Sequence, residues 1–97
     1  MKAVMITYNQ AITEKVDYLL DYLEIRGYTK WHDVQGRGTL SGMPHLGTHT
    51  WPEMNSAIMT VIEEEKLQSL LENIKKLNSV NEDIGIRAFV WNIEHAV

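Results

Sequence analysis

Residues able to bind an anion gather at the start of one glycine-rich segment, residues 35–55. Gly36 and Gly38 flank Arg37 there, and backbone amides without side chains can approach a phosphate closely. A guanidinium adds charge-assisted hydrogen bonds to the same group. Arg87, far downstream, offers a second guanidinium. These residue types can bind an anion, but a lone Gly-x-Gly is by itself a weak signal for a phosphate site.

Each of these candidates also has a purely structural explanation. The two glycines could supply positive backbone angles at a β-bulge. Arg87 could pair with a nearby acid such as Glu82 or Asp83. The spacing of the residues leaves both alternatives open.

Histidines suggest a second kind of chemistry in the same segment. His45 and His49 lie four residues apart, and His32 lies near the segment's start. Imidazoles are good ligands for zinc, copper or nickel. Pro44 and Gly47 interrupt any helix that would bring His45 and His49 together. A site for a divalent transition metal ion is therefore one hypothesis, and solvated or interface histidines are the other.

The segment 35–55 is too long for a simple connection between strands. A β-hairpin needs two to five residues, and loops beyond about 15 residues are usually functional or disordered. Its glycines and both prolines of the chain prevent regular structure. It also carries apolar side chains that a merely solvated linker lacks, namely Met43, Leu46, Trp51 and Met54. Function is expected to reside here.

Two amphipathic helices and four apolar strands must position this segment. Val16, Leu19, Leu20 and Leu23 form a helical stripe, with Thr13 predicted as N-cap and Gly27 as the left-handed end. Glu63, Glu64 and Glu65 open a second helix, whose C-terminal end Lys75 and Lys76 would complement. The predicted strands are 3–8, 28–34, 56–62 and 86–93.

The element order β-α-β-β-α-β predicts an α+β, ferredoxin-like fold. In this sandwich a four-stranded antiparallel sheet carries two helices on one face, and the long loop joins strands two and three. The strands are apolar on both faces, as Phe89, Trp91 and Ile93 alternate with Ile86, Ala88 and Val90. We expect another copy to cover the open face, whereas the alternative is a monomer with a few exposed apolar residues.

Composition excludes several classes of function. The chain has 97 residues, which is one ordinary domain over residues 1–97. A net charge of −4 without a basic face disfavours nucleic-acid binding. Cysteine is absent, which excludes disulfide scaffolds and thiol nucleophiles. The first apolar run is too short for a signal peptide, so we expect a cytoplasmic protein. No nucleophile–base pair or carboxylate dyad stands out, so we expect no enzyme.

Several segments resemble PII signalling proteins. Residues 27–38, from Gly27-Tyr28 to Gly36-Arg37-Gly38, are similar to that family's second strand and its Gly-x-Gly at the base of a long loop. Met1-Lys2-Ala3-Val4 is similar to the first strand, and Val61-Ile62 leads into an acidic helix start as the family does. Residues 87–93 resemble the last core strand. The resemblance covers nearly the whole chain, although its individual motifs are loose.

The resemblance implies a homotrimer with its sheets facing inward. In that family small effectors, typically adenine nucleotides, bind in the clefts between subunits. The long loops then change shape and dock on a protein partner, often a membrane transporter or a metabolic enzyme. Gly36, Arg37, Gly38 and Arg87 would surround the effector. Related small trimers are associated with metal tolerance, which keeps the histidine hypothesis open.

The sequence departs from the family at three ligand positions. The family's Gly-Asp-Gly-Lys loop falls on Ile84-Gly85-Ile86-Arg87, Leu40 replaces a loop glutamine, and Asn55 replaces a lysine. These departures favour a ligand other than ATP with 2-oxoglutarate. We therefore predict a PII-like regulator that binds a small effector and acts through residues 35–55. A metal-sensing trimer and a partner-binding adaptor without a small ligand are the alternatives.

Overall fold

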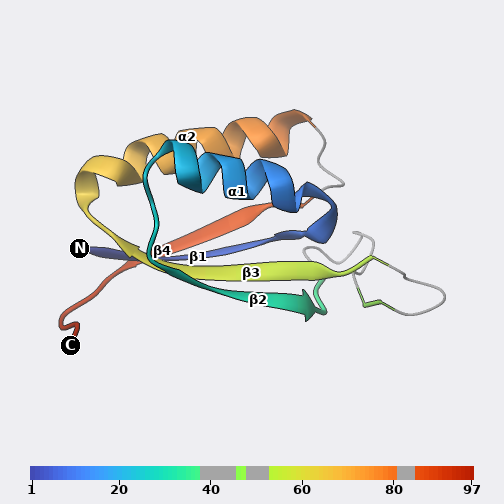
Figure 1. Cartoon of the computed structure of the whole chain (residues 1–97), viewed down its shortest axis with the longest axis horizontal. Coiled ribbons are helices and arrows are strands. Elements are labelled where there is room, and N and C mark those ends of the chain that lie inside the picture. Colours follow the sequence, from blue (N-terminus) through green and yellow to red (C-terminus); the bar gives the residue numbers. More distant parts are fainter. Residues whose placement is uncertain (38–45, 48–52, 81–84) are drawn as a thin grey trace.

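The computed structural model describes residues 1–37, 46–47, 53–80 and 85–97. A four-stranded sheet lies beneath a layer of two helices (Figure 1). The elements are, in chain order, β1 (Lys2–Asn9), the 3-10 turn η1 (Gln10–Ile12), α1 (Thr13–Tyr22), β2 (Tyr28–Val34), β3 (Asn55–Ile62), α2 (Glu64–Val80) and β4 (Arg87–Asn92). The predicted strands agree with these bounds to within a residue.

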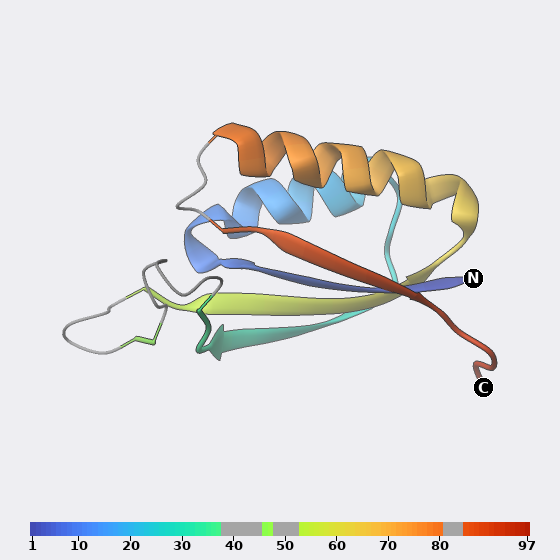
Figure 2. The ribbon, with the colours of Figure 1, turned by 180° about the vertical axis from the view of Figure 1, so that it is seen from behind.

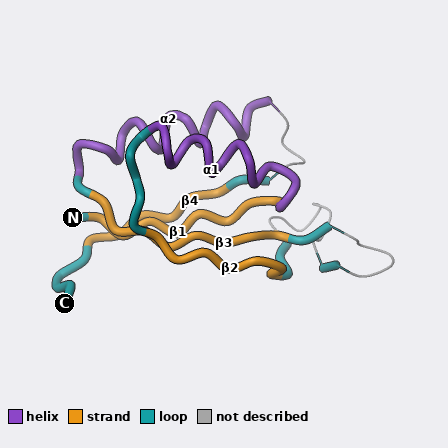
Figure 3. The backbone as a smooth tube through the Cα atoms, in the orientation of Figure 1, coloured by secondary structure: helices purple, strands orange, loops and turns teal. Residues whose placement is uncertain are grey.

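The strand order β2-β3-β1-β4, with every neighbour antiparallel, confirms the ferredoxin-like α+β fold (Figure 3). β1 is central and pairs along its length with β3, from Lys2 opposite Ile62 to Asn9 opposite Asn55. β4 and β2 are the two edges. The long segment 35–55 therefore leaves from an edge strand and returns to an inner one.

The core lies between the sheet and the helices, which both cover the same face (Figure 2). Because side chains alternate along a strand, β1 presents Val4, Ile6 and Tyr8 to the helices. The predicted stripe of α1 packs onto them, with Val16, Leu19 and Leu20 buried. No helix among the described residues is long and apolar enough to cross a membrane.

The other face of the sheet is uncovered and apolar, as the alternation predicted. Its exposed large side chains come from three strands and are Trp31 (45% exposed), Val61 (38%), Phe89 (51%) and Trp91 (44%). The register places Phe89 opposite Met5, and Trp91 opposite Ala3. This set of side chains, the open face, leaves a large apolar surface in contact with water in a single chain.

The prediction that Gly27 ends the first helix was wrong. α1 stops at Tyr22, and Glu24 takes the left-handed backbone conformation at φ 57°. The amide of Ile25 donates to Leu20 O (2.8 Å) and that of Glu24 to Asp21 O (3.0 Å), which is the Schellman pattern. Ile25 is buried at 4% exposure, so its docking into the core ends the helix early.

The other predicted helix ends also needed correction. Asn9 rather than Thr13 provides the first cap, since Asn9 Oδ1 accepts from Ala11 N (2.9 Å) at the start of η1. Thr13 is the first residue of α1, and its Oγ1 donates to Gln10 O (2.7 Å). α2 continues to Val80, so Lys75 and Lys76 lie before its last turn, which contains no basic residue.

Glu24→Gly is expected to raise the free energy of unfolding by about 1 kcal/mol, because glycine occupies left-handed backbone without steric cost. Gly27→Ala is the matched variant. Its new Cβ would meet nothing within 4 Å, and Gly27 has no positive φ, so alanine should be tolerated. Urea denaturation measures both. A Glu24→Gly variant no more stable than the wild type, with a strongly destabilised Gly27→Ala, would contradict the cap at Glu24.

Candidate functional site

Both ends of the segment 35–55 meet at one end of the sheet, beside β1. Val34 pairs with Asn55, which also pairs with Asn9. The chain leaves β2 toward Gly36 and Arg37 and returns through Met54 into β3 (Figure 1). We call residues 33–37 and 53–55 the loop base.

Gln10 contacts both sides of the loop base. Its side-chain oxygen accepts a hydrogen bond from Asp33 N (2.7 Å), and its own backbone N donates to Met54 O (3.0 Å). Asp33 lies in a register shift between Trp31 and Val34 and has a left-handed φ of 56°. A non-glycine residue rarely adopts this conformation without compensation. Gln10 thus holds the entry and the exit of the loop to the turn that precedes α1.

Gly36 allows a close approach rather than an unusual backbone angle. A Cβ added to Gly36 would overlap the side-chain nitrogen of Asn55, and the φ of Gly36 is not positive. The bulge alternative therefore applies to Asp33 and not to Gly36. Gly38 lies outside the described residues. The side chain of Arg37 is exposed next to this contact.

A short described piece of the loop, Leu46 and Gly47, contacts the loop base. Gln35 Nε2 donates to Leu46 O (2.9 Å), and Gly47 N donates to Glu53 O (3.0 Å). Gly47 has a φ of 67°, and a Cβ there would overlap the Met54 sulfur. Glycine is therefore needed at this position for both its conformation and its space.

Arg87 starts β4 at the same end of the sheet, but on the opposite edge from β2. It pairs with Thr7, and its guanidinium carbon lies 5.7 Å from the centre of the exposed Phe89 ring. β3 and β1 separate it from the end of β2, so about 14 Å, or three strand spacings, lie between the two edges. The structure does not bring Arg37 and Arg87 together within one chain.

Of the three candidate metal ligands, only His32 lies among the described residues. It is an exposed residue of β2. His45 and His49 fall outside the described part of the chain. Within that part, no group of three or more histidine or acidic side chains could hold a metal ion.

Sequence reasoning missed a polar contact beneath α1. Lys30 on β2 donates from Nζ to Asp17 on α1, with its side chain only 15% exposed. Burial alone would lower the pKa of Lys30, but the bond to Asp17 and nearby groups raise it above its usual value. Burial also raises the pKa of neighbouring Tyr8. The only signal in the sequence is a lysine on the helix-facing side of β2.

The fold, with its long loop at one end of an open-faced sheet, defines a ferredoxin-like α+β domain. The chain matches the family model for nitrogen regulatory protein P-II over residues 1–97. This chain therefore belongs to the P-II family, as a divergent, PII-like member. A search of curated protein sequences found no relative that matches it.

Solved structures agree with this assignment. CPII, a nitrogen regulatory PII-like protein from Thiomonas intermedia K12 bound to ADP, AMP and bicarbonate, is 25% identical with a TM-score of 0.76, covering 99% of this chain and 92% of CPII. Its apo form gives 23% identity and a TM-score of 0.71, covering 95% and 87%. A PII-like signalling protein from Thermus thermophilus gives 21% and 0.67, covering 95% and 85%.

Gln10→Ala is expected to speed hydrogen exchange of the Asp33 amide about fivefold, because one hydrogen bond of roughly 1 kcal/mol is lost. Gln10→Glu keeps an acceptor oxygen and should retain the protection. Amide exchange followed by NMR gives the rates.

Gln68→Ala serves as the control, because Gln68 donates to Glu72 on the surface of α2, away from the loop base. Unchanged Asp33 protection in Gln10→Ala would show that the loop base is held by other contacts.

Proposed function

We propose that this protein is a cytoplasmic, homotrimeric PII-like regulator that binds an adenine nucleotide between subunits. The long loop 35–55 would carry the signal to a protein partner, a membrane transporter or a metabolic enzyme. No catalytic step is part of this function. The placement of Arg37 and Arg87 at the same end but on opposite edges of one sheet carries the proposal, because a neighbouring subunit can bring two such edges together.

The related CPII structures support the choice of an adenine nucleotide. CPII is described with ADP, AMP and bicarbonate, and also with ADP and bicarbonate alone, at 25% identity to this chain. A nucleotide phosphate suits the Arg37 and Arg87 guanidinium groups and the amides around Gly36. Arg37 and Arg87 form no salt bridge with another described residue. Glu82 and Asp83, the possible partners of Arg87 in the sequence, lie outside the described residues.

The open face supports assembly. Phe89, Trp91 and Trp31 are each near half exposed, and burying such rings contributes about 1.5–3 kcal/mol each. A copy of the same chain is a suitable cover, since each subunit presents the same apolar surface. When the open faces of three subunits turn toward a common centre, the helices lie outside and the loop bases lie near the clefts between subunits.

The loop base supports a role in signalling. Arg37 lies next to the segment that Gln10 holds to the start of α1. An anion bound at Arg37 would therefore act directly on the residues that set the direction of the loop. Ordering of a segment by a bound phosphate is a common switching device.

Phe89→Glu is expected to convert the trimer to a monomer, because a carboxylate would be buried in an apolar interface without a partner. Sedimentation velocity measures the mass. Val80→Glu is the matched control, since Val80 is also exposed but belongs to the helix layer. A trimer that survives Phe89→Glu would place the interface elsewhere.

A subunit-mixing experiment tests the proposed cleft. Arg37→Ala and Arg87→Ala should each weaken ADP binding by about 10- to 100-fold, the loss of one charge-assisted hydrogen bond. When the two variants are unfolded and refolded together, about a quarter of the clefts regain both arginines if these come from different subunits. Titration calorimetry counts the restored sites.

Arg26→Ala provides the control, because Arg26 lies in the connection between α1 and β2, at the other end of the sheet. Gly38→Val should also weaken ADP binding while leaving the trimer intact. Undiminished affinity in both single arginine variants would refute the site. If both single variants lose affinity for ADP and mixing them restores no sites, the two arginines belong to the site of one subunit instead.

A further inference from the structure

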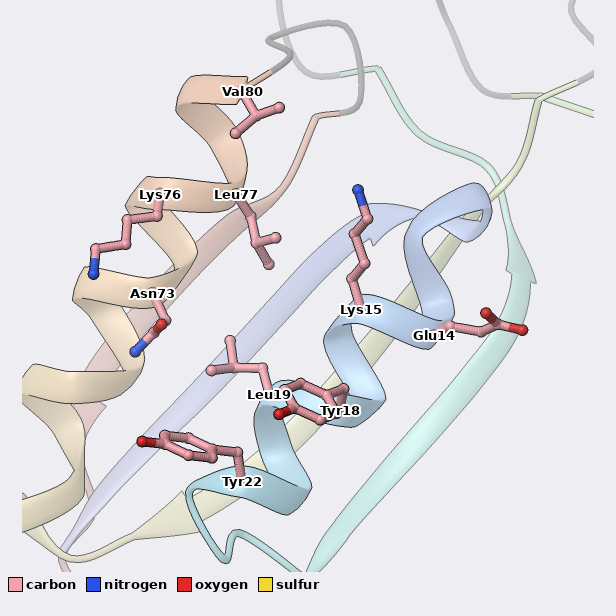
Figure 4. Close-up of a pocket in the computed structure, with 9 residues that line it drawn as sticks. All are labelled: Glu14, Lys15, Tyr18, Leu19, Tyr22, Asn73, Lys76, Leu77 and Val80. Carbon is pink, nitrogen blue, oxygen red and sulfur yellow. The ribbon is translucent and has the colours of Figure 1, made fainter.

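A groove of about 620 Å³ runs between α1 and α2 on the helix layer (Figure 4). It lies on the side of the molecule away from the open face, so an assembly that buries the sheet leaves it accessible. Its lining residues are Glu14, Lys15, Tyr18, Leu19, Tyr22, Asn73, Lys76, Leu77 and Val80.

Two tyrosines form one wall of the groove. Tyr18 and Tyr22 are 73% and 71% exposed, and their rings stack with centroids 6.4 Å apart and planes 16° from parallel. The core requires neither ring, because Val16, Leu19 and Leu20 already anchor α1. Paired exposed aromatic rings are costly in water and are enriched at protein interfaces, where a ring loses little conformational entropy.

The opposite wall is also apolar. Leu77 and Val80 lie one turn apart on α2, and Val80 is 78% exposed. In Figure 4 the Leu77 and Leu19 side chains point into the space between the two helices. An apolar strip therefore lines both sides of an open groove, with Leu19 at its floor.

Cations flank this apolar strip. Lys15 comes from α1 and Lys76 from α2, and neither forms a salt bridge within the described residues. The chain as a whole carries a net negative charge, with 13 acidic and nine basic residues. The two unpaired lysines beside this groove are therefore an exception to its overall charge. The carboxylate of Glu14 also lines the groove. In Figure 4 it points away from α2, as the Lys76 ammonium points away from α1. The lining as a whole contains two ammonium groups and one carboxylate. The charge next to the rings therefore favours an acidic occupant.

We propose that this groove docks a short acidic, amphipathic segment of a partner protein. From Glu14 to Tyr22 the groove follows about 12 Å of α1, which suits two turns of a helix with apolar residues one turn apart. Its apolar side chains would pack between the tyrosines and Leu77, while its carboxylates reach Lys15 and Lys76. The groove is open along its length, which favours a peptide over a small molecule that needs enclosure. This surface is separate from the proposed effector cleft and stands without it.

The test is selection of binders from a displayed library of random 16-residue peptides on the intact protein. The selected peptides are expected to carry acidic residues, together with apolar residues spaced three or four positions apart. Tyr18→Ala with Tyr22→Ala should weaken them at least tenfold, the usual effect of removing aromatic interface anchors. Tyr28→Ala is the matched control, because Tyr28 is an exposed tyrosine on β2.

Charge reversal sharpens the test. Lys15→Glu with Lys76→Glu should abolish binding of the acidic winners and select basic peptides instead. Affinity for the acidic peptides should also fall with added salt. Circular dichroism checks that both double variants keep their helices, which is expected because all four side chains lie along the groove and outside the core.

Three results would overturn the proposal. Selected peptides could be neutral or basic on the wild-type protein. They could bind the tyrosine double variant as well as the wild type. Sedimentation could show further self-association that the tyrosine variant abolishes, in which case a second copy of this chain is the occupant.

Discussion

The register between β1 and β3 is the constraint on which the rest of the structure depends. Because side chains alternate, it decides that Val4, Ile6 and Tyr8 meet the helices while Ala3, Met5 and Thr7 face away. A slip by one residue would exchange the core for the open face. The same register fixes Asn9 opposite Asn55, and so sets where the long loop leaves the sheet.

The edge strand β2 has one strand neighbour and depends on contacts with other elements. Lys30 joins it to Asp17 of α1, and the amide of Asp33 is bound by Gln10. Both contacts lead from β2 to the segment formed by η1 and α1. These hydrogen bonds connect the loop base to the turn before α1, and the groove between α1 and α2 begins at Glu14 and Lys15 in the first turn of α1. The loop base and the groove are thus neighbours through η1.

Much of this could be predicted from the sequence, for a clear physical reason. Alternation and helical stripes are local, so the strands, the helices and the apolar open face followed from periodicity. The ends of the helices could not be predicted in this way. Gly27 was the obvious helix end, but burial of Ile25 outweighed the preference for glycine and put Glu24 in the left-handed position. Tertiary packing decides such cases, and no window of sequence contains it.

The candidate site illustrates the same limit at longer range. Gly36, Arg37 and Arg87 could be selected by residue type and by resemblance, and the predicted fold already places their strands at opposite edges. The close approach of Gly36 to the Asn55 side chain could not be predicted, because it depends on tertiary packing. The role of Gln10 in holding the loop base could not be predicted from the sequence for a similar reason. Gln10 binds the loop base only because Asp33, 23 residues away, adopts a left-handed conformation and donates its backbone amide to the Gln10 side chain.

The architecture of the fold determines which surfaces of the domain are covered and which stay accessible. A ferredoxin-like sheet with helices on one face must expose the other, and apolar residues there are best used against copies of the same chain. The proposed assembly through that face would leave the helix layer and the loop end accessible. The cations Arg37 and Arg87 occupy the loop end, and the tyrosine pair with its two lysines occupies the helix layer. Gln10 of η1 binds the loop base, and the groove begins in the first turn of α1, so the shortest connection between these two surfaces runs through η1 and α1.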